Sequence, residues 1–125
     1  MDKLPASLLV FLGAGLGGVA RFWLSEAISS PRNGFPLATL CINAAGCFGV
    51  GCLIGAIPVM SGVTRLVIVA GLLGGFTTFS AFARETVELW QSGRVSTAAV
   101  YVVSSTVASI ALAATGFVIA RRCTA

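Results

Sequence analysis

The sequence predicts an all-α membrane protein with four transmembrane helices, on two observations. Hydrophobic residues make up 57% of the 125-residue chain and charged residues only 10%, whereas soluble domains average about 25% charged residues. The charges are also segregated, because four runs contain none: 4–20, 33–64, 66–83 and 95–120. A spanning helix needs about 20 largely apolar residues, so we expect a single integral-membrane domain over residues 1–125.

Turn-forming residues separate the four expected helices. They gather at 29–36 (SSPRNGFP), around Pro58 and at 91–94 (QSGR). The predicted helices therefore span about 5–29, 36–57, 63–90 and 96–121. Pro5 suits the first turn of a helix, and Ser96 is the expected N-cap of the last one.

The third helix carries its weakest helical sequence at its centre, GGFTTFSAF at 74–82. We expect it to open over Gly74–Thr77. An opened membrane helix frees backbone groups that need protein, water or an ion. The freed carbonyls suit a cation, whereas the N-terminus of the following half-helix suits an anion. Phe79 and Phe82 share a face there, and the positive edges of their rings could contact an anion.

Polar side chains interrupt two other apolar runs. Asn43 and Thr39 lie one turn apart in the second helix, and Tyr101, Ser105 and Ser109 form a line of hydroxyls on the fourth. Helix-to-helix hydrogen bonds explain such residues equally well. Hydroxyl donors with no carboxylate nearby nevertheless suit an anion better than a cation.

Pairs of glycines four residues apart indicate close helix packing. They are Gly13 with Gly17, Gly51 with Gly55, and Gly71 with Gly75. The cysteines (Cys41, Cys47, Cys52 and Cys123) have no metal-binding spacing and no histidine beside them, so we interpret them as small apolar residues.

Several function classes lack the residues that they need. The acids, Asp2, Glu26, Glu85 and Glu88, lie near the ends of predicted helices, and no catalytic set occurs, so we do not expect an enzyme. The basic residues are scattered over the loops and helix ends, which favours interfacial anchors over a nucleic-acid surface.

The basic residues are balanced between the two sides of the membrane. Four spans place Lys3, Arg65, Arg121 and Arg122 on one side, and Arg21, Arg32, Arg84 and Arg94 on the other. An excess of Lys and Arg normally sets the orientation. Equal counts favour a chain that inserts both ways and pairs as an antiparallel homodimer, unless a few residues decide the orientation alone.

Three motifs, in the same order, carry a resemblance to a known family. The segment GGFTTFSAFARE at 74–85 resembles the GGxTTFSTF signature of the Fluc fluoride channels, also called the CrcB family. TLCINAAGCFGVG at 39–51 is similar to the second helix of that family, and GGVAR at 17–21 to its first. The resemblance covers nearly the whole chain. It implies a passive, fluoride-selective channel that exports fluoride across the cytoplasmic membrane and relieves fluoride toxicity.

The resemblance also implies roles for particular residues. In the antiparallel, dual-topology homodimer of the family, a structural Na⁺ would be held by backbone carbonyls of Gly74 and Thr77 from both subunits. Arg21 and Glu85 correspond to residues near the vestibule. The implied fluoride pathway contains Thr39, Asn43, Phe79, Ser80, Phe82, Tyr101, Ser105 and Ser109.

The sequence departs from the family pattern at two positions, and two other functions remain as alternatives. Ala81 stands where many members have Thr, and Ala113 follows Ser109 by one turn, which leaves open the number of polar contacts along the path. A small dual-topology multidrug exporter agrees in size and charge balance but lacks an acid within the first helix. A non-transporting membrane subunit would explain the glycine pairs but not the Thr-Thr pair near Asn43.

Overall fold

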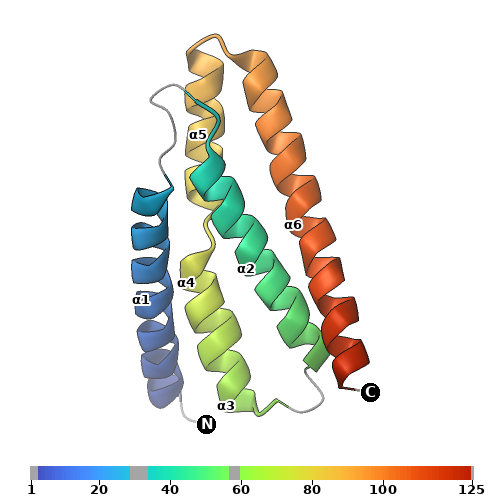
Figure 1. Cartoon of the computed structure of the whole chain (residues 1–125). Helices are drawn as coiled ribbons and strands as arrows, with labels where there is room; N and C mark the ends of the chain where they lie inside the picture. Colours follow the sequence, from blue (N-terminus) through green and yellow to red (C-terminus); the bar gives the residue numbers. More distant parts are fainter. Residues whose placement is uncertain (1–2, 29–33, 57–59, 125) are drawn as a thin grey trace.

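The third of four membrane-length helices is broken (Figure 1). The computed structural model describes residues 3–28, 34–56 and 60–124. Their elements, in order, are α1 (Lys3–Ala27), α2 (Leu37–Ala56), α3 (Gly62–Arg65), the π-helix η2 (Leu66–Leu73), α4 (Gly74–Phe76), α5 (Phe79–Gln91) and α6 (Val95–Cys123). The run from α3 to α5 forms the third span, and both chain ends lie at the same end of the bundle.

The predicted helices agree with these bounds to within about two residues, and Pro5 lies in the first turn of α1. The predicted ends at Ser29 and Ile57, and the loop residue Pro58, fall outside the described residues. The predicted N-cap was wrong: α6 begins at Val95, so Ser96 lies inside it, and Arg94 occupies the cap position without a side-chain cap bond. The cause is a tight turn, in which Gly93 has φ 77° and the N–H of Arg94 donates to the carbonyl of Leu89 at 2.9 Å.

The break in the third span lies later than we predicted. Gly74–Phe76 is helical, and the backbone extends at Thr77 (ψ 154°) and Thr78 (ψ 113°). The Thr pair opens the helix because Thr78 acts as the N-cap of α5, with its Oγ1 accepting from the N–H of Ala81 at 3.2 Å. Gly75 serves packing instead, since a side chain there would meet the backbone of Ala14.

A π-helix precedes the break, and nothing in the sequence predicted it. Leu66–Leu73 forms eight residues of η2 between two α-helical segments. Such i→i+5 segments are rare and occur mostly near functional sites. Here the π-helix presents Val67, Gly71 and Leu72 to α1, where Gly13 approaches them closely.

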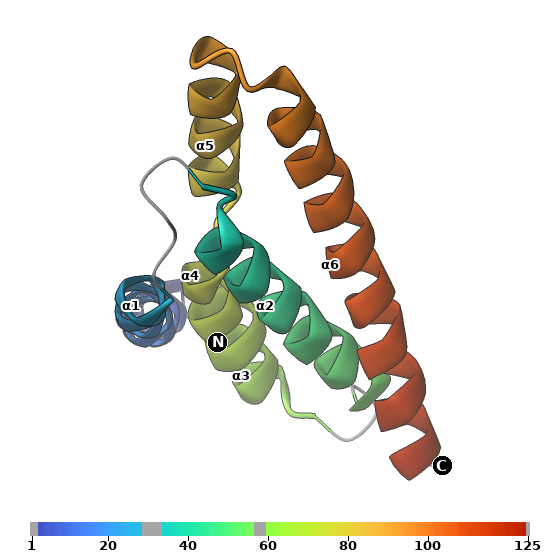
Figure 2. The same cartoon turned by 45° about the horizontal axis from the view of Figure 1, so that its top comes forward.

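The predicted glycine pairs do allow close helix contacts. A Cβ at Gly13 would lie 2.6 Å from the carbonyl oxygen of Val67, and one at Gly17 would overlap the carbonyl of Leu72. On the other side of the bundle, Gly51 packs on the backbone of Ala113 and Gly55 on that of Phe117. These contacts pair α1 with η2 and α4, and α2 with α6 (Figure 2).

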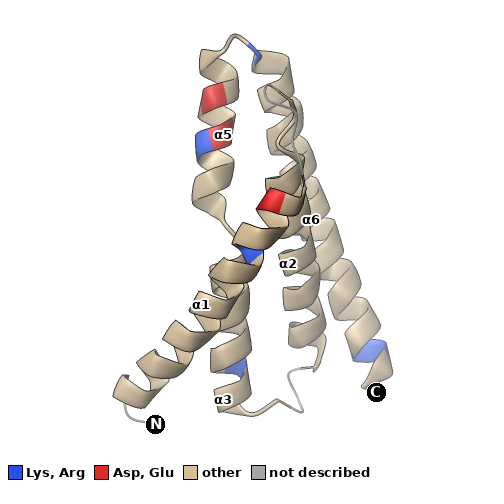
Figure 3. Cartoon of the chain, turned by 60° about the vertical axis from the view of Figure 1, so that its left-hand side comes forward, with Lys and Arg blue, Asp and Glu red and all other residues tan. Residues whose placement is uncertain are grey.

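Charged residues are few and lie mainly toward the ends of the bundle (Figure 3). Large side chains such as Phe11, Trp23 and Trp90 are exposed, as expected for helices that face lipid. Arg21 is an exception, because it lies within α1 and bonds inside the bundle rather than in a loop. Asp2 and Arg32 fall outside the described residues. The fold is thus that of a multi-pass integral membrane protein.

Candidate functional site

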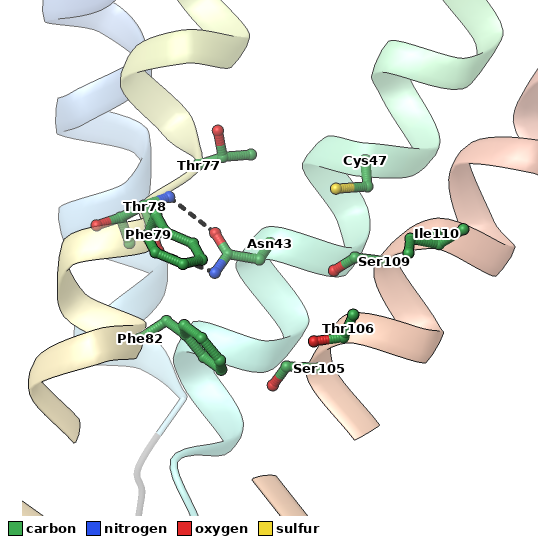
Figure 4. A pocket seen from close by; sticks show the side chains of 10 residues that line it. All are labelled: Asn43, Cys47, Thr77, Thr78, Phe79, Phe82, Ser105, Thr106, Ser109 and Ile110. Carbon is green, nitrogen blue, oxygen red and sulfur yellow. Dashed lines mark hydrogen bonds between the residues drawn. The ribbon is translucent and has the colours of Figure 1, made fainter. Parts of the chain in front are cut away.

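A side chain from α2 bonds to the backbone of the break at Thr78. Nδ2 of Asn43 donates to the carbonyl oxygen of Thr78 at 3.0 Å, and Oδ1 accepts from the N–H of Thr78 at 2.8 Å (Figure 4). The amide therefore replaces the carbonyl of Gly74, to which the N–H of Thr78 would donate in an unbroken helix. Because a primary amide has two N–H donors, one N–H of Asn43 remains for another acceptor.

The carbonyls on either side of the break have lost their helical donors. In a continuous helix Gly74 would accept from Thr78 and Thr77 from Ala81, but those N–H groups donate to Asn43 and to Thr78 Oγ1. Nε of Arg21 donates to a third carbonyl, that of Gly75, at 3.2 Å. Backbone carbonyl oxygens are hard ligands that suit Na⁺, so Gly74 and Thr77 fit a cation site chemically.

A cavity of about 310 Å³ lies beside the break between α2, α5 and α6 (Figure 4). Its lining residues are Asn43, Cys47, Thr77, Thr78, Phe79, Phe82, Ser105, Thr106, Ser109 and Ile110. None of these ten side chains is charged, yet several carry hydrogen-bond donors. We call this space the break cavity.

One hydroxyl of the break cavity lacks a partner. Ser105 is only 6% exposed, and within the described part of the chain its Oγ makes no hydrogen bond. Buried polar groups are nearly always paired, and an unpaired one costs about 1–3 kcal/mol. The hydroxyl is therefore a donor that a small anion in the cavity would satisfy.

Two phenylalanines from α5 form the aromatic wall of the break cavity. The ring centroids of Phe79 and Phe82 lie 5.4 Å apart, and Phe82 in turn contacts the ring of Tyr101 at 5.2 Å. Tyr101 is fully buried, and Phe35 packs edge-on against it at 5.4 Å. Phe82 thus lines the break cavity and also contacts the buried ring of Tyr101.

A carboxylate lies directly behind this aromatic contact, contrary to our expectation that the hydroxyl line has no carboxylate nearby. Glu85 Oε1 accepts from Thr39 Oγ1 at 2.8 Å, and Oε2 accepts from the Tyr101 hydroxyl at 2.7 Å. The expectation was wrong because it considered α6 alone, whereas the acid comes from α5. Tyr101 and Thr39 thus bond to an acid and do not line the break cavity.

A second cavity of about 330 Å³ lies on the far side of Glu85, toward the α5–α6 turn. We call it the outer cavity. It is lined by Gly34, Pro36, Ala38, Thr39, Arg84, Glu85, Glu88, Leu89, Ser92 and Arg94. A chain of contacts joins the two cavities: Phe82 lines the break cavity and packs on Tyr101, whose hydroxyl donates to Glu85 of the outer cavity.

The structure brings together most, but not all, of the predicted pathway residues. Asn43, Phe79, Phe82, Ser105 and Ser109 line the break cavity. Thr39 and Tyr101 meet at Glu85, and Ser80 is exposed, with its Oγ 3.3 Å from Thr78 Oγ1.

Sequence reasoning missed four lining residues: Cys47, Thr78, Thr106 and Ile110. Cys47 follows Asn43 by one helical turn, so its position on the same face of α2 could have predicted that it lines the cavity. Thr78 is one of the two adjacent threonines at the centre of the third helix, and that pair could have predicted its place in the lining.

Comparison with known proteins shows which family the chain belongs to. The sequence profile described as "CrcB-like protein, Camphor Resistance (CrcB)" matches residues 8–117. The chain belongs to the CrcB family. The CrcB match includes both cavities and the break, since it runs from the second turn of α1 to near the end of α6.

Curated relatives of this CrcB chain match over most of its length. A protein of Paracoccus denitrificans (strain Pd 1222) is 42% identical over 116 residues, which cover 91% of this chain and 93% of the relative. One from Methylobacterium sp. (strain 4-46) is 42% identical over 118 residues, covering 92% and 95%. Both are named "Fluoride-specific ion channel FluC".

Proposed function

We propose that this chain is a passive, fluoride-selective ion channel, not an enzyme, which exports fluoride across the cytoplasmic membrane and relieves fluoride toxicity. Membership of the CrcB family and relatives named fluoride-specific ion channels support the activity. One observation in the structure carries the proposal: an uncharged cavity next to a helix break contains the unpaired, buried Ser105 hydroxyl.

The proposed pathway offers fluoride weak donors in sequence. Fluoride holds its water tightly, so a path must replace that water with donors without binding the ion too strongly to leave. Asn43 has a spare N–H, and Ser105 and Ser109 add hydroxyls. The ring edges of Phe79 and Phe82 are weakly positive. Beyond Phe82, the proposed path continues past Glu85 into the outer cavity.

The proposed functional unit is an antiparallel homodimer with dual topology. The break needs cover, because Gly74 is exposed and Phe79 is 80% exposed on one protomer, and a freed carbonyl facing lipid is costly. A second copy would cover both. Balanced basic residues support insertion in both directions. Reporters fused to the C-terminus that function on one side only would find both orientations, whereas a single orientation would exclude dual topology.

We further propose that Na⁺ is held at the dimer axis by carbonyls of Gly74 and Thr77 from both subunits. The diverted N–H groups of Thr78 and Ala81 support these ligands. When bound, the ion supplies a fixed positive charge near the anion path. Asn43 and Arg21 hold the adjacent backbone, whatever occupies the axis.

The two alternative functions explain less of the structure. A multidrug exporter would need an ionisable group in its binding cavity, and none of the lining residues of the break cavity is charged. A non-transporting subunit would account for the glycine contacts but not for an unpaired buried hydroxyl in a cavity. Neither alternative explains the unpaired hydroxyl of Ser105 in the break cavity.

The test is fluoride efflux from liposomes that contain the purified protein, with an ionophore to balance charge. Fluoride should leave and chloride should not; equal chloride efflux, or no efflux, would overturn the proposal. Phe82→Ile should reduce fluoride efflux at least about tenfold by removing the ring edge at the cavity wall. Phe11→Ile is the matched control, since Phe11 is exposed on α1 and lines neither cavity.

A further inference from the structure

The outer cavity contains four charged side chains, two of each sign. Arg84 and Arg94 line it together with Glu85 and Glu88. Its formal charge is therefore zero, whereas the break cavity has no charged lining residue. On the proposed pathway an anion must cross this charged space next to Glu85.

Arg84 bonds to both acids at once. Its Nη1 lies 2.8 Å from Glu88 Oε1, and its Nη2 lies 3.7 Å from Glu85 Oε1. The Arg84 side chain is 62% exposed and that of Glu85 only 18%. An exposed cation thus reaches inward to an acid that is largely covered.

Glu85 has no other cationic partner among the described residues. Its remaining hydrogen bonds come from the neutral hydroxyls of Thr39 and Tyr101, which hold the carboxylate in place without removing its charge. On the proposed pathway an anion that passes Phe82 meets this carboxylate next, because Phe82 packs on Tyr101, Tyr101 donates to Glu85, and Glu85 lines the outer cavity.

We propose that Arg84 sets the rate of fluoride passage by neutralising the acids of the outer cavity. The inference rests on the proposed function and extends it to a residue outside the break cavity. Without Arg84 the outer cavity carries a formal charge of −1, and like charge repels the anion along its path. With Arg84 present, Glu85 can anchor Thr39 and Tyr101 while the cavity stays neutral toward fluoride.

The role of Arg84 is electrostatic rather than structural. Exposed ion pairs contribute little to stability, so Arg84→Gln should fold like the parent. Steering by local charge changes association rates by about tenfold or more and weakens as salt rises. The screening length falls from about 30 Å at 0.01 M salt to about 8 Å at 0.15 M. The effect of Arg84 should therefore be large at low ionic strength and small at high ionic strength.

The experiment measures fluoride efflux from liposomes at both ionic strengths, with an impermeant salt on both sides. We expect Arg84→Gln to slow efflux about tenfold at low salt and about twofold at high salt. Arg65→Gln, at an exposed position lining neither cavity, is the charge-matched control and should conduct like the parent. Restoring neutrality with Arg84→Gln combined with Glu88→Gln should recover most of the low-salt rate.

The outcomes separate this inference from the proposed function. A parent protein that passes no fluoride would overturn both. Parent-like efflux of Arg84→Gln at low salt would overturn the role of Arg84 alone. A loss that neither salt nor the Glu88→Gln change restores would also overturn it, because it would indicate a structural effect.

Discussion

The side-chain amide of Asn43 bonds to both backbone polar groups of Thr78, the residue at which the third span breaks. The contact joins α2 to the start of α5 across 35 residues of sequence. It satisfies a backbone that would otherwise be unpaired at membrane depth, and it fixes the amide at the wall of the break cavity.

We predict that Asn43→Asp destabilises the protein and blocks fluoride. A carboxylate of the same shape still accepts from the N–H of Thr78 but no longer donates to its carbonyl, and its charge repels an anion. The lost bond should cost about 1–3 kcal/mol, and fluoride efflux should fall more than about tenfold.

Thermal unfolding in detergent and liposome efflux measure the two effects of Asn43→Asp. Thr106→Val is the control. Thr106 also lines the break cavity, but its hydroxyl donates to the carbonyl of Val102 in its own helix at 2.8 Å. If Asn43→Asp melts and conducts like the parent, the amide is not what holds the break.

We predict that Ser105→Ala lowers fluoride conduction without lowering the stability of the protein. Its hydroxyl is buried and makes no hydrogen bond within the described residues, so removing it should leave the free energy of unfolding unchanged or raise it by up to about 1 kcal/mol. Fluoride efflux should nevertheless fall about threefold to tenfold, because the path loses a donor.

Ser104→Ala is the neighbouring control for Ser105→Ala. Ser104 Oγ donates to the carbonyl of Tyr101 in the same helix at 3.3 Å, and Ser104 lines neither cavity. Fluoride efflux through Ser104→Ala should therefore equal that of the parent. A destabilised Ser105→Ala protein with normal efflux would mean that the hydroxyl serves packing.

We predict that two adjacent glycines of α1 differ sharply in tolerance. A Cβ at Gly17 would overlap the carbonyl of Leu72 and lie 2.8 Å from the backbone nitrogen of Phe76, whereas one at Gly18 meets nothing within 4 Å. Gly17→Ala should therefore lower the free energy of unfolding by about 1–3 kcal/mol. Gly18→Ala should be neutral or stabilising by up to about 1 kcal/mol, because alanine favours helix.

Thermal unfolding of the two glycine variants, made in parallel, measures this difference. Equal melting temperatures would show that α1 can move away from η2 and α4 at no cost.

Local pattern was sufficient to predict the four spans, the glycine contacts and the shared face of Phe79 and Phe82. These features depend on charge-free length and on helical spacing, which a sequence displays directly. The resemblance, rather than spacing, pointed to fluoride, whereas Asn43 stood out already as a polar residue within an apolar run.

Features that depend on a partner from another helix were not predictable in the same way. The break lies at Thr77 and Thr78 rather than over the predicted Gly74–Thr77, and Asn43 from another helix bonds to Thr78 there. Glu85 was expected near a helix end and the vestibule, and its bond to Thr39, 46 residues away, was not predicted. The π-helix at Leu66–Leu73 has no known marker in sequence, and it faces closely packed glycines of α1.

The order of the chain bears on how the broken span enters a bilayer. The two side chains that bond to its backbone, Arg21 and Asn43, belong to α1 and α2. Synthesis proceeds from the N-terminus, so both helices exist before Thr78 leaves the ribosome. The weakest segment therefore emerges last among its partners, and its unpaired amide and carbonyl groups need not wait in lipid for a bond. Moving the break to α1 would remove that protection, because no helix would yet be present to receive it.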